Sequence, residues 1–108
     1  MNLTFSSFAD PGNFDKERLI LKATADLALG DYLVMLSKIS DQGSAYSGRH
    51  SAFWFPDGNV KSDDLIALYT KSGTASTKAL ENGRTAHFFY WGLSNAIWTA
   101  TERQGAVI

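Results

Sequence analysis

Short runs in which apolar and polar residues alternate, separated by turn-forming residues, constrain this chain more than any other feature of its sequence. In the segment 17–24, Leu19, Leu21 and Ala23 share one side of an extended chain, and the charged residues share the other. A period of two residues is typical of a strand with one buried face. Apolar spacing of three to four residues, which predicts helices, is scarce. The sequence therefore predicts an all-β protein.

The strand pattern and the turns together predict an immunoglobulin-like, antiparallel β-sandwich. The segments 10–13 (DPGN) and 56–59 (PDGN) are strong turn signals because proline presets φ and glycine tolerates positive φ. Short strands at this spacing favour two packed sheets. Hydroxyl-rich and glycine-rich stretches predict long loops at 37–51 and 71–85, with one helical turn at 78–81. The expected strands are 3–8, 17–24, 32–36, 52–55, 64–70, 86–91, 96–101 and 105–108.

Length and composition indicate one packed domain, residues 1–108. The chain has 108 residues, of which 44% are hydrophobic and 13% aromatic, so it is able to bury a single core. Ten Lys and Arg residues against eleven Asp and Glu residues give a net charge of -1, and the cations are scattered along the chain. Binding of nucleic acid draws on clustered cations, so nucleic acid is not the expected partner.

The chain contains no cysteine, which excludes disulfides, thiolate metal ligands and thiol nucleophiles. Its first residues lack a basic stretch followed by an apolar run, so no signal peptide is expected. It has no run of eighteen apolar residues, so no transmembrane helix is expected. We therefore expect a cytoplasmic protein that does not contact a membrane.

Residues capable of catalysis or metal binding do not form recognisable motifs. His50 and His87 are the only histidines, and neither has a second ligand at the spacing of a metal site. No serine lies in a Gly-x-Ser-x-Gly elbow, and the segment 43–48 lacks the Lys-Ser/Thr pair of a phosphate loop. We predict no catalytic residues, no metal and no cofactor, and hence a protein that is not an enzyme.

Three segments carry a resemblance to a known family. They are 53–58 (FWFPDG), 64–73 (DLIALYTKSG) and 90–98, where YWGL is followed by AIW. In these segments the chain resembles the lamin tail domain, over residues 17–108 and most densely over 52–108. The resemblance implies an immunoglobulin-like β-sandwich and an adaptor-like module that engages protein or nucleic acid. It brings no catalytic residues, and fold analogy alone does not establish function.

The aromatic residues are the remaining signal of a functional surface. In the segment 86–91, alternate side chains point to opposite faces, and both faces carry large aromatic area. We take one set to reach the surface, namely His87, Phe89 and Trp91. These three residues are the expected contact patch for a protein partner or for self-association.

Two alternatives to this patch stay open. An exposed sheet edge is the second choice of contact surface, because charges are present that could block an edge: Lys61, Asp63 and Asp64 before one strand, and Arg18 and Lys22 on another. A small ligand or a nucleic acid is the second choice of partner, bound by exposed aromatics and by the 37–51 loop with Arg49 and His50. Salt would separate the two classes of partner, because phosphate contacts weaken steeply as salt rises.

One aromatic residue is expected to be structural. Trp98 lies beside Ile97 in the predicted strand 96–101. Because large aromatic side chains dominate small β cores, we expect Trp98 to be a buried core residue.

Overall fold

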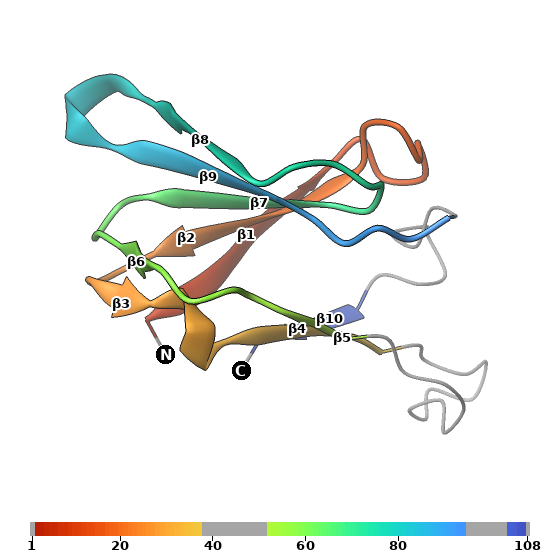
Figure 1. Cartoon of the computed structure of the whole chain (residues 1–108), viewed down its shortest axis with the longest axis horizontal. Helices are drawn as coiled ribbons and strands as arrows, with labels where there is room; N and C mark the ends of the chain where they lie inside the picture. Colours follow the sequence, from red (N-terminus) through yellow and green to blue (C-terminus); the bar gives the residue numbers. More distant parts are fainter. Residues whose placement is uncertain (1, 38–51, 95–103, 108) are drawn as a thin grey trace.

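The computed structural model describes residues 2–37, 52–94 and 104–107, and Figure 1 shows how their strands are arranged. This described part is all-β, and its helical pieces are two 3-10 turns, η1 (Leu29–Asp31) and η2 (Glu81–Gly83). Its strands are β1 (Leu3–Ala9), β2 (Arg18–Ala23), β3 (Leu27–Ala28), β4 (Leu33–Ser37), β5 (Ala52–Trp54), β6 (Asn59–Val60), β7 (Leu65–Tyr69), β8 (Ser76–Ala79), β9 (Thr85–Tyr90) and β10 (Gln104–Val107).

A five-stranded sheet with the order β1-β2-β7-β9-β8 forms the larger layer. Its neighbouring strands run antiparallel except β7 and β9, which run parallel. The expectation of purely antiparallel strands is therefore wrong at this pair. The connectivity explains the difference: β8 lies between β7 and β9 in the sequence but takes the edge of the sheet, which leaves β9 to run beside β7 in the same direction.

The alternation predicted for the segment 17–24 is confirmed in β2. Leu19 and Leu21 are buried, whereas Lys22 is exposed. Leu19 pairs with Leu68 and Leu21 pairs with Ile66 on β7, and these two partners are buried as well. Because paired residues of a ladder share a face, one apolar face runs across both strands.

The second layer consists of a three-stranded sheet, β10-β4-β5, and a two-stranded sheet, β3-β6. Figure 1 shows β3, β4, β5 and β10 on the lower side of the view, with β7, β8 and β9 above them. The core cluster draws on both layers, with Leu19, Leu21, Ile66 and Leu68 from the large sheet and Val34, Phe55 and Val60 from the second layer. The core therefore lies between the two layers, and each large apolar side chain buried there contributes about 1.5–3 kcal/mol.

A buried acid, Glu17, ties the β1–β2 turn to the end of β7. Its carboxylate accepts hydrogen bonds from the Gly12 N–H at 2.9 Å and from the Thr70 hydroxyl at 2.5 Å. A buried carboxylate is costly unless it is hydrogen-bonded, so these donors are what make its burial tolerable. The turn predicted at 10–13 is confirmed, with the Asn13 N–H donating to the Asp10 carbonyl at 3.1 Å.

The segment 71–85, expected to be a loop, contains the strand β8. All four of its residues are exposed, so the sequence has no buried face and no period of two that would announce a strand. Backbone pairing with β9 makes it one. The helical turn expected at 78–81 is wrong, because β8 continues to Ala79 and η2 begins at Glu81.

Several predictions lie outside the described residues. They are the loop 37–51 beyond Ser37, which belongs to β4, and the strand 96–101 with its expected core residue Trp98. The last predicted strand is confirmed as β10, which pairs antiparallel with β4.

Candidate protein-contact site

Trp54 is the most exposed large apolar side chain in the described part of the chain. It lies on β5 with 69% of its surface accessible. The alternation of side chains along an extended chain explains this orientation. Phe53 and Phe55 turn towards the core, where their ring centroids lie 5.3 Å apart. The side chain between them therefore points outward.

The indole of Trp54 is held in a fixed orientation. Its Nε1–H donates a hydrogen bond to the Gly30 carbonyl over 2.6 Å. Gly30 belongs to η1, which is fixed in turn by a hydrogen bond from the Leu29 N–H to the Gly58 carbonyl at 2.7 Å. An aromatic side chain that is already oriented loses little conformational entropy when a partner packs on it. The Trp54 indole is thus both exposed and held in place.

The Asp57 carboxylate lies close to this indole, and Asp31 is the residue after Gly30 in η1. A Cβ built on Gly30 would overlap the Asp57 carboxylate, so the Asp57 side chain lies directly against Gly30. The same glycine accepts the Trp54 hydrogen bond, which brings the carboxylate and the indole to one residue. Asp31 follows Gly30 in the chain and is exposed. Among the described residues, neither Asp31 nor Asp57 forms an ion pair, so the surface beside Trp54 carries uncompensated negative charge.

Trp54 also lies on an edge of its sheet. In the described part of the chain, β5 pairs with β4 alone, and an edge strand presents unpaired backbone groups to a partner. The edges of the larger sheet are β1 and β8. The expectation that these charges block an edge is wrong, because the strands concerned are interior. Arg18 and Lys22 belong to β2, and Lys61, Asp63 and Asp64 directly precede β7.

The expected contact patch faces the core. The Phe89 ring lies 5.2 Å from the Phe55 ring, and Trp91 lies 6.1 Å from Phe53, with both Phe89 and Trp91 packed against the core cluster. Alternation placed them on one face with His87, but it does not indicate which face is internal when both are aromatic. Their role in binding stays a prediction, and this placement moves our choice of contact surface to Trp54.

His87 forms a largely buried hydrogen bond with Asp64. Its Nε2 lies 2.9 Å from the Asp64 Oδ2, and the carboxylate also accepts the N–H groups of Lys61 and Thr85, each at 3.0 Å. Burial alone would raise the pKa of Asp64, but the hydrogen bonds from His87, Lys61 and Thr85, with the charge of His87, lower it below its ordinary value of 3.8. In the described part of the chain, no hydroxyl is hydrogen-bonded to His87. The pair therefore joins the turn before β7 to β9 and lacks the nucleophile of a catalytic triad.

On the opposite face of the large sheet, aromatic rings contact one another across strands. Tyr69 stacks on Tyr90 with ring centroids 5.1 Å apart, and Arg18 lies over the Tyr69 ring at 5.5 Å. A Cβ on Gly73 would lie 2.6 Å from the Tyr90 ring, so the Gly73 backbone packs directly on that ring. These rings are already covered by groups of the protein, which makes them a poor stacking platform for nucleic-acid bases.

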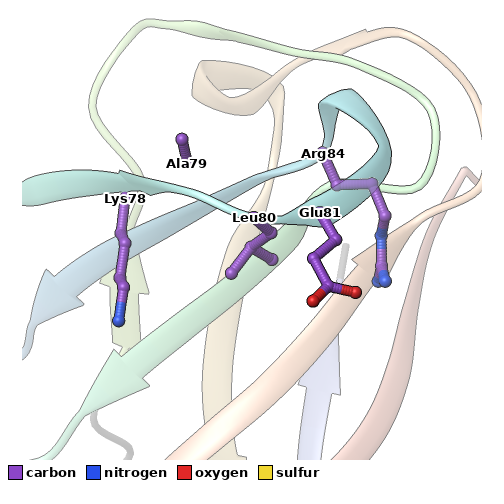
Figure 2. A pocket seen from close by; sticks show the side chains of 5 residues that line it. All are labelled: Lys78, Ala79, Leu80, Glu81 and Arg84. Carbon is purple, nitrogen blue, oxygen red and sulfur yellow. The ribbon is translucent and has the colours of Figure 1, made fainter.

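An open hollow lies beside the turn between β8 and β9. Figure 2 shows the residues that line it, of which all but the second project to one side of the hairpin: Lys78, Ala79, Leu80, Glu81 and Arg84. The Arg84 Nε–H donates to the Asp63 carbonyl at 2.9 Å. The hollow is open to solvent and its charges have both signs, so it lacks the enclosed, mainly apolar character of a small-molecule site.

Two of the predicted binding residues, Arg49 and His50, lie outside the described residues. Within the ranges 2–37, 52–94 and 104–107, no three His, Asp or Glu side chains gather as metal ligands. No helix in the same ranges is long and apolar enough to cross a membrane.

Comparison with models of known protein families gives no match for this chain, and no curated protein matches its sequence. The resemblance to the lamin tail domain therefore stays a prediction from three sequence segments. The geometry around Trp54 carries the functional inference.

Proposed function

We propose that this protein is a non-catalytic binding or assembly module that acts through protein–protein contacts, with Trp54 at the centre of its contact surface. One observation carries the proposal: Trp54 is 69% exposed while its indole is held by the Gly30 carbonyl. Tryptophan is among the residues that contribute most of the binding energy in protein interfaces. Its preorganised ring offers a partner a large apolar contact at small entropic cost.

A protein partner fits this surface better than a small ligand or a nucleic acid. Asp31 and Asp57 beside Trp54 would repel phosphate groups, and phosphate contacts supply most of the affinity for nucleic acid. The stacked pair Tyr69 and Tyr90 is covered within the protein. The ligand-binding alternative would depend on the 37–51 loop, which lies outside the described residues beyond Ser37.

We also propose that the two layers form an immunoglobulin-like β-sandwich of the lamin tail type. The layers enclose one core, which supports a sandwich. The first two resembling segments fall on β5 with the turn after it and on β7, and the described part of the third, 90–94, begins at the last residue of β9. Two of them meet where the Phe53 ring lies 6.1 Å from the Trp91 ring. The parallel pairing of β7 with β9 is a departure from an antiparallel sandwich.

A photoreactive side chain tests the contact surface. We expect p-benzoylphenylalanine in place of Ala52, an exposed residue on the same face of β5 as Trp54, to crosslink, in an extract of the source cells, to a discrete protein, either another protein or a second copy of this chain. The same group in place of Phe5, which is 56% exposed on β1, is the matched control and should give no such adduct. The adducts are identified by mass spectrometry. Adducts of equal yield from both positions, or an adduct only with nucleic acid, would contradict the proposal.

A further inference from the structure

We infer that the surface formed by Trp54, Asp57 and Asp31 receives a lysine or arginine side chain of a partner protein. This inference rests on the proposed function and adds the chemistry of the partner. It starts from the juxtaposition at Gly30, which touches the indole through its carbonyl and the Asp57 carboxylate through its Cα side.

The exposed ring supplies the first half of the recognition. A cation within about 6 Å of a tryptophan face is attracted by the negative charge of the π system, more strongly than over tyrosine or phenylalanine. The hydrogen bond from Nε1 to Gly30 prevents the Trp54 indole from turning freely, so its orientation relative to η1 is set before binding. The aliphatic stem of a lysine or arginine side chain would pack on the apolar part of the same ring.

The carboxylates supply the second half of the recognition, a negative charge for the cation. Three carboxylates of the described chain have a basic partner: Asp10 lies 3.0 Å from Arg18, Asp63 lies 3.7 Å from Lys22, and Asp64 lies 2.9 Å from His87. Asp57 has no ion-pair partner among the described residues although its side chain is held against Gly30. A carboxylate that is positioned beside an exposed indole matches a ligand that combines positive charge with an apolar stem.

This charge also selects among partners. An acidic peptide or a phosphate would meet Asp31 and Asp57 with like charge, which costs binding free energy. A neutral apolar partner would cover Trp54 but leave the carboxylate at Gly30 desolvated and without a cation. A basic segment satisfies both groups.

Two short peptides with blocked ends probe the site directly: Gly-Arg-Gly-Arg-Gly, and its acidic counterpart Gly-Glu-Gly-Glu-Gly. The readout is the NMR signal of the Trp54 indole N–H, identified as the signal that disappears in Trp54→Phe. We expect the basic peptide to shift this signal saturably at millimolar concentration, and the acidic peptide to leave it in place.

Asp57→Asn should weaken binding of the basic peptide about threefold to fivefold, because one exposed charge pair is lost. The control Asp15→Asn changes an exposed carboxylate in the β1–β2 turn and should leave the affinity unchanged. Equal affinity for the two peptides would overturn the inference. So would an Asp57→Asn variant that binds the basic peptide as tightly as the wild type does.

The crosslinking experiment separates this inference from the proposed function. Asp31→Asn and Asp57→Asn are introduced together into the chain that keeps Trp54 and carries the photoreactive group at position 52, and circular dichroism verifies that the fold is intact. Loss of the protein adduct supports the inference. An undiminished adduct overturns the inference and leaves the proposed function standing, whereas absence of an adduct from the parent chain overturns both.

Discussion

Asp63 and Asp64 are adjacent in the sequence, yet only the second is buried. Asp63 has a φ of 74°, a left-handed conformation that aspartate tolerates better than most residues. Its carboxylate lies on the surface, 3.7 Å from the Lys22 ammonium. The Asp64 side chain turns inward and accepts three hydrogen bonds, one of them from His87. One backbone conformation thus separates a solvated charge from a buried one.

The Asp64 carboxylate should make stability depend on pH in the acid range. Its pKa is lower in the folded protein than its ordinary value of 3.8, so the stabilisation is complete above that value and is lost as the pH falls through the lowered pKa. We expect Asp64→Asn to unfold more easily at neutral pH, by about 1–3 kcal/mol, and to lose less stability on acidification than the wild type. Urea unfolding at a series of pH values measures both effects.

The matched control for this prediction is Asp15→Asn, because Asp15 is exposed in the β1–β2 turn. This variant should keep the acid sensitivity of the wild type. An Asp64→Asn variant whose stability falls with pH as steeply as that of the wild type would show that another group is responsible.

Among the secondary-structure elements, those with a buried face could be predicted from the sequence. β2 and β7 were predicted from their apolar residues, and both are confirmed. β8 was missed because its residues are all exposed, and β3 and β6 have only two residues each. The parallel pairing of β7 and β9 depends on where β8 lies, which a local pattern does not specify. Local alternation therefore predicts where strands lie better than it predicts which strands pair.

The same limit applies to the candidate site. The outward direction of Trp54 follows from its place between Phe53 and Phe55, a signal present in the sequence. The sequence does not single out Trp54 as an exposed residue, because three consecutive aromatic residues show no contrast between buried and exposed positions. The approach of Asp57 to Gly30 joins residues that are distant in the sequence, and only the folded chain brings them together.

The loop between β7 and β8 requires a glycine at position 73. A Cβ there would lie 2.6 Å from the Tyr90 ring, so Gly73→Ala should displace the ring or the loop and cost about 1–3 kcal/mol of stability. Gly58→Ala is the control, since a Cβ at Gly58 meets nothing within 4 Å, and it should change stability by less than about 0.5 kcal/mol. Thermal unfolding followed by circular dichroism compares the two variants. Equal melting temperatures for both would contradict the close packing of Gly73 on Tyr90.

For the molecule as a whole, a small group of aromatic rings joins the two layers. Phe55 precedes β6 in the second layer, and its ring meets the Phe89 ring of β9 edge to face, with an interplanar angle of 73°. Phe53 of β5 contacts both Phe89 and Trp91, at 6.4 Å and 6.1 Å. These contacts cross from one sheet to the other, so the layers should lose their structure together.

Phe55→Ala tests this coupling between the layers. Phe55 is 2% exposed, and removing a buried phenylalanine side chain costs about 3–5 kcal/mol because apolar burial is lost and a cavity remains. We expect one cooperative urea transition in the wild type and in the variant, shifted to lower urea in the variant. Far-ultraviolet circular dichroism, which reports all strands, and fluorescence of the three tryptophans, of which Trp91 lies beside Phe53, should give the same midpoint in each protein. Phe5→Ala is the control, because Phe5 is 56% exposed, and it should cost less than about 1 kcal/mol. Two separate transitions in the variant would mean that each layer is stable without the other, and a midpoint equal to that of Phe5→Ala would mean that Phe55 does not hold them together.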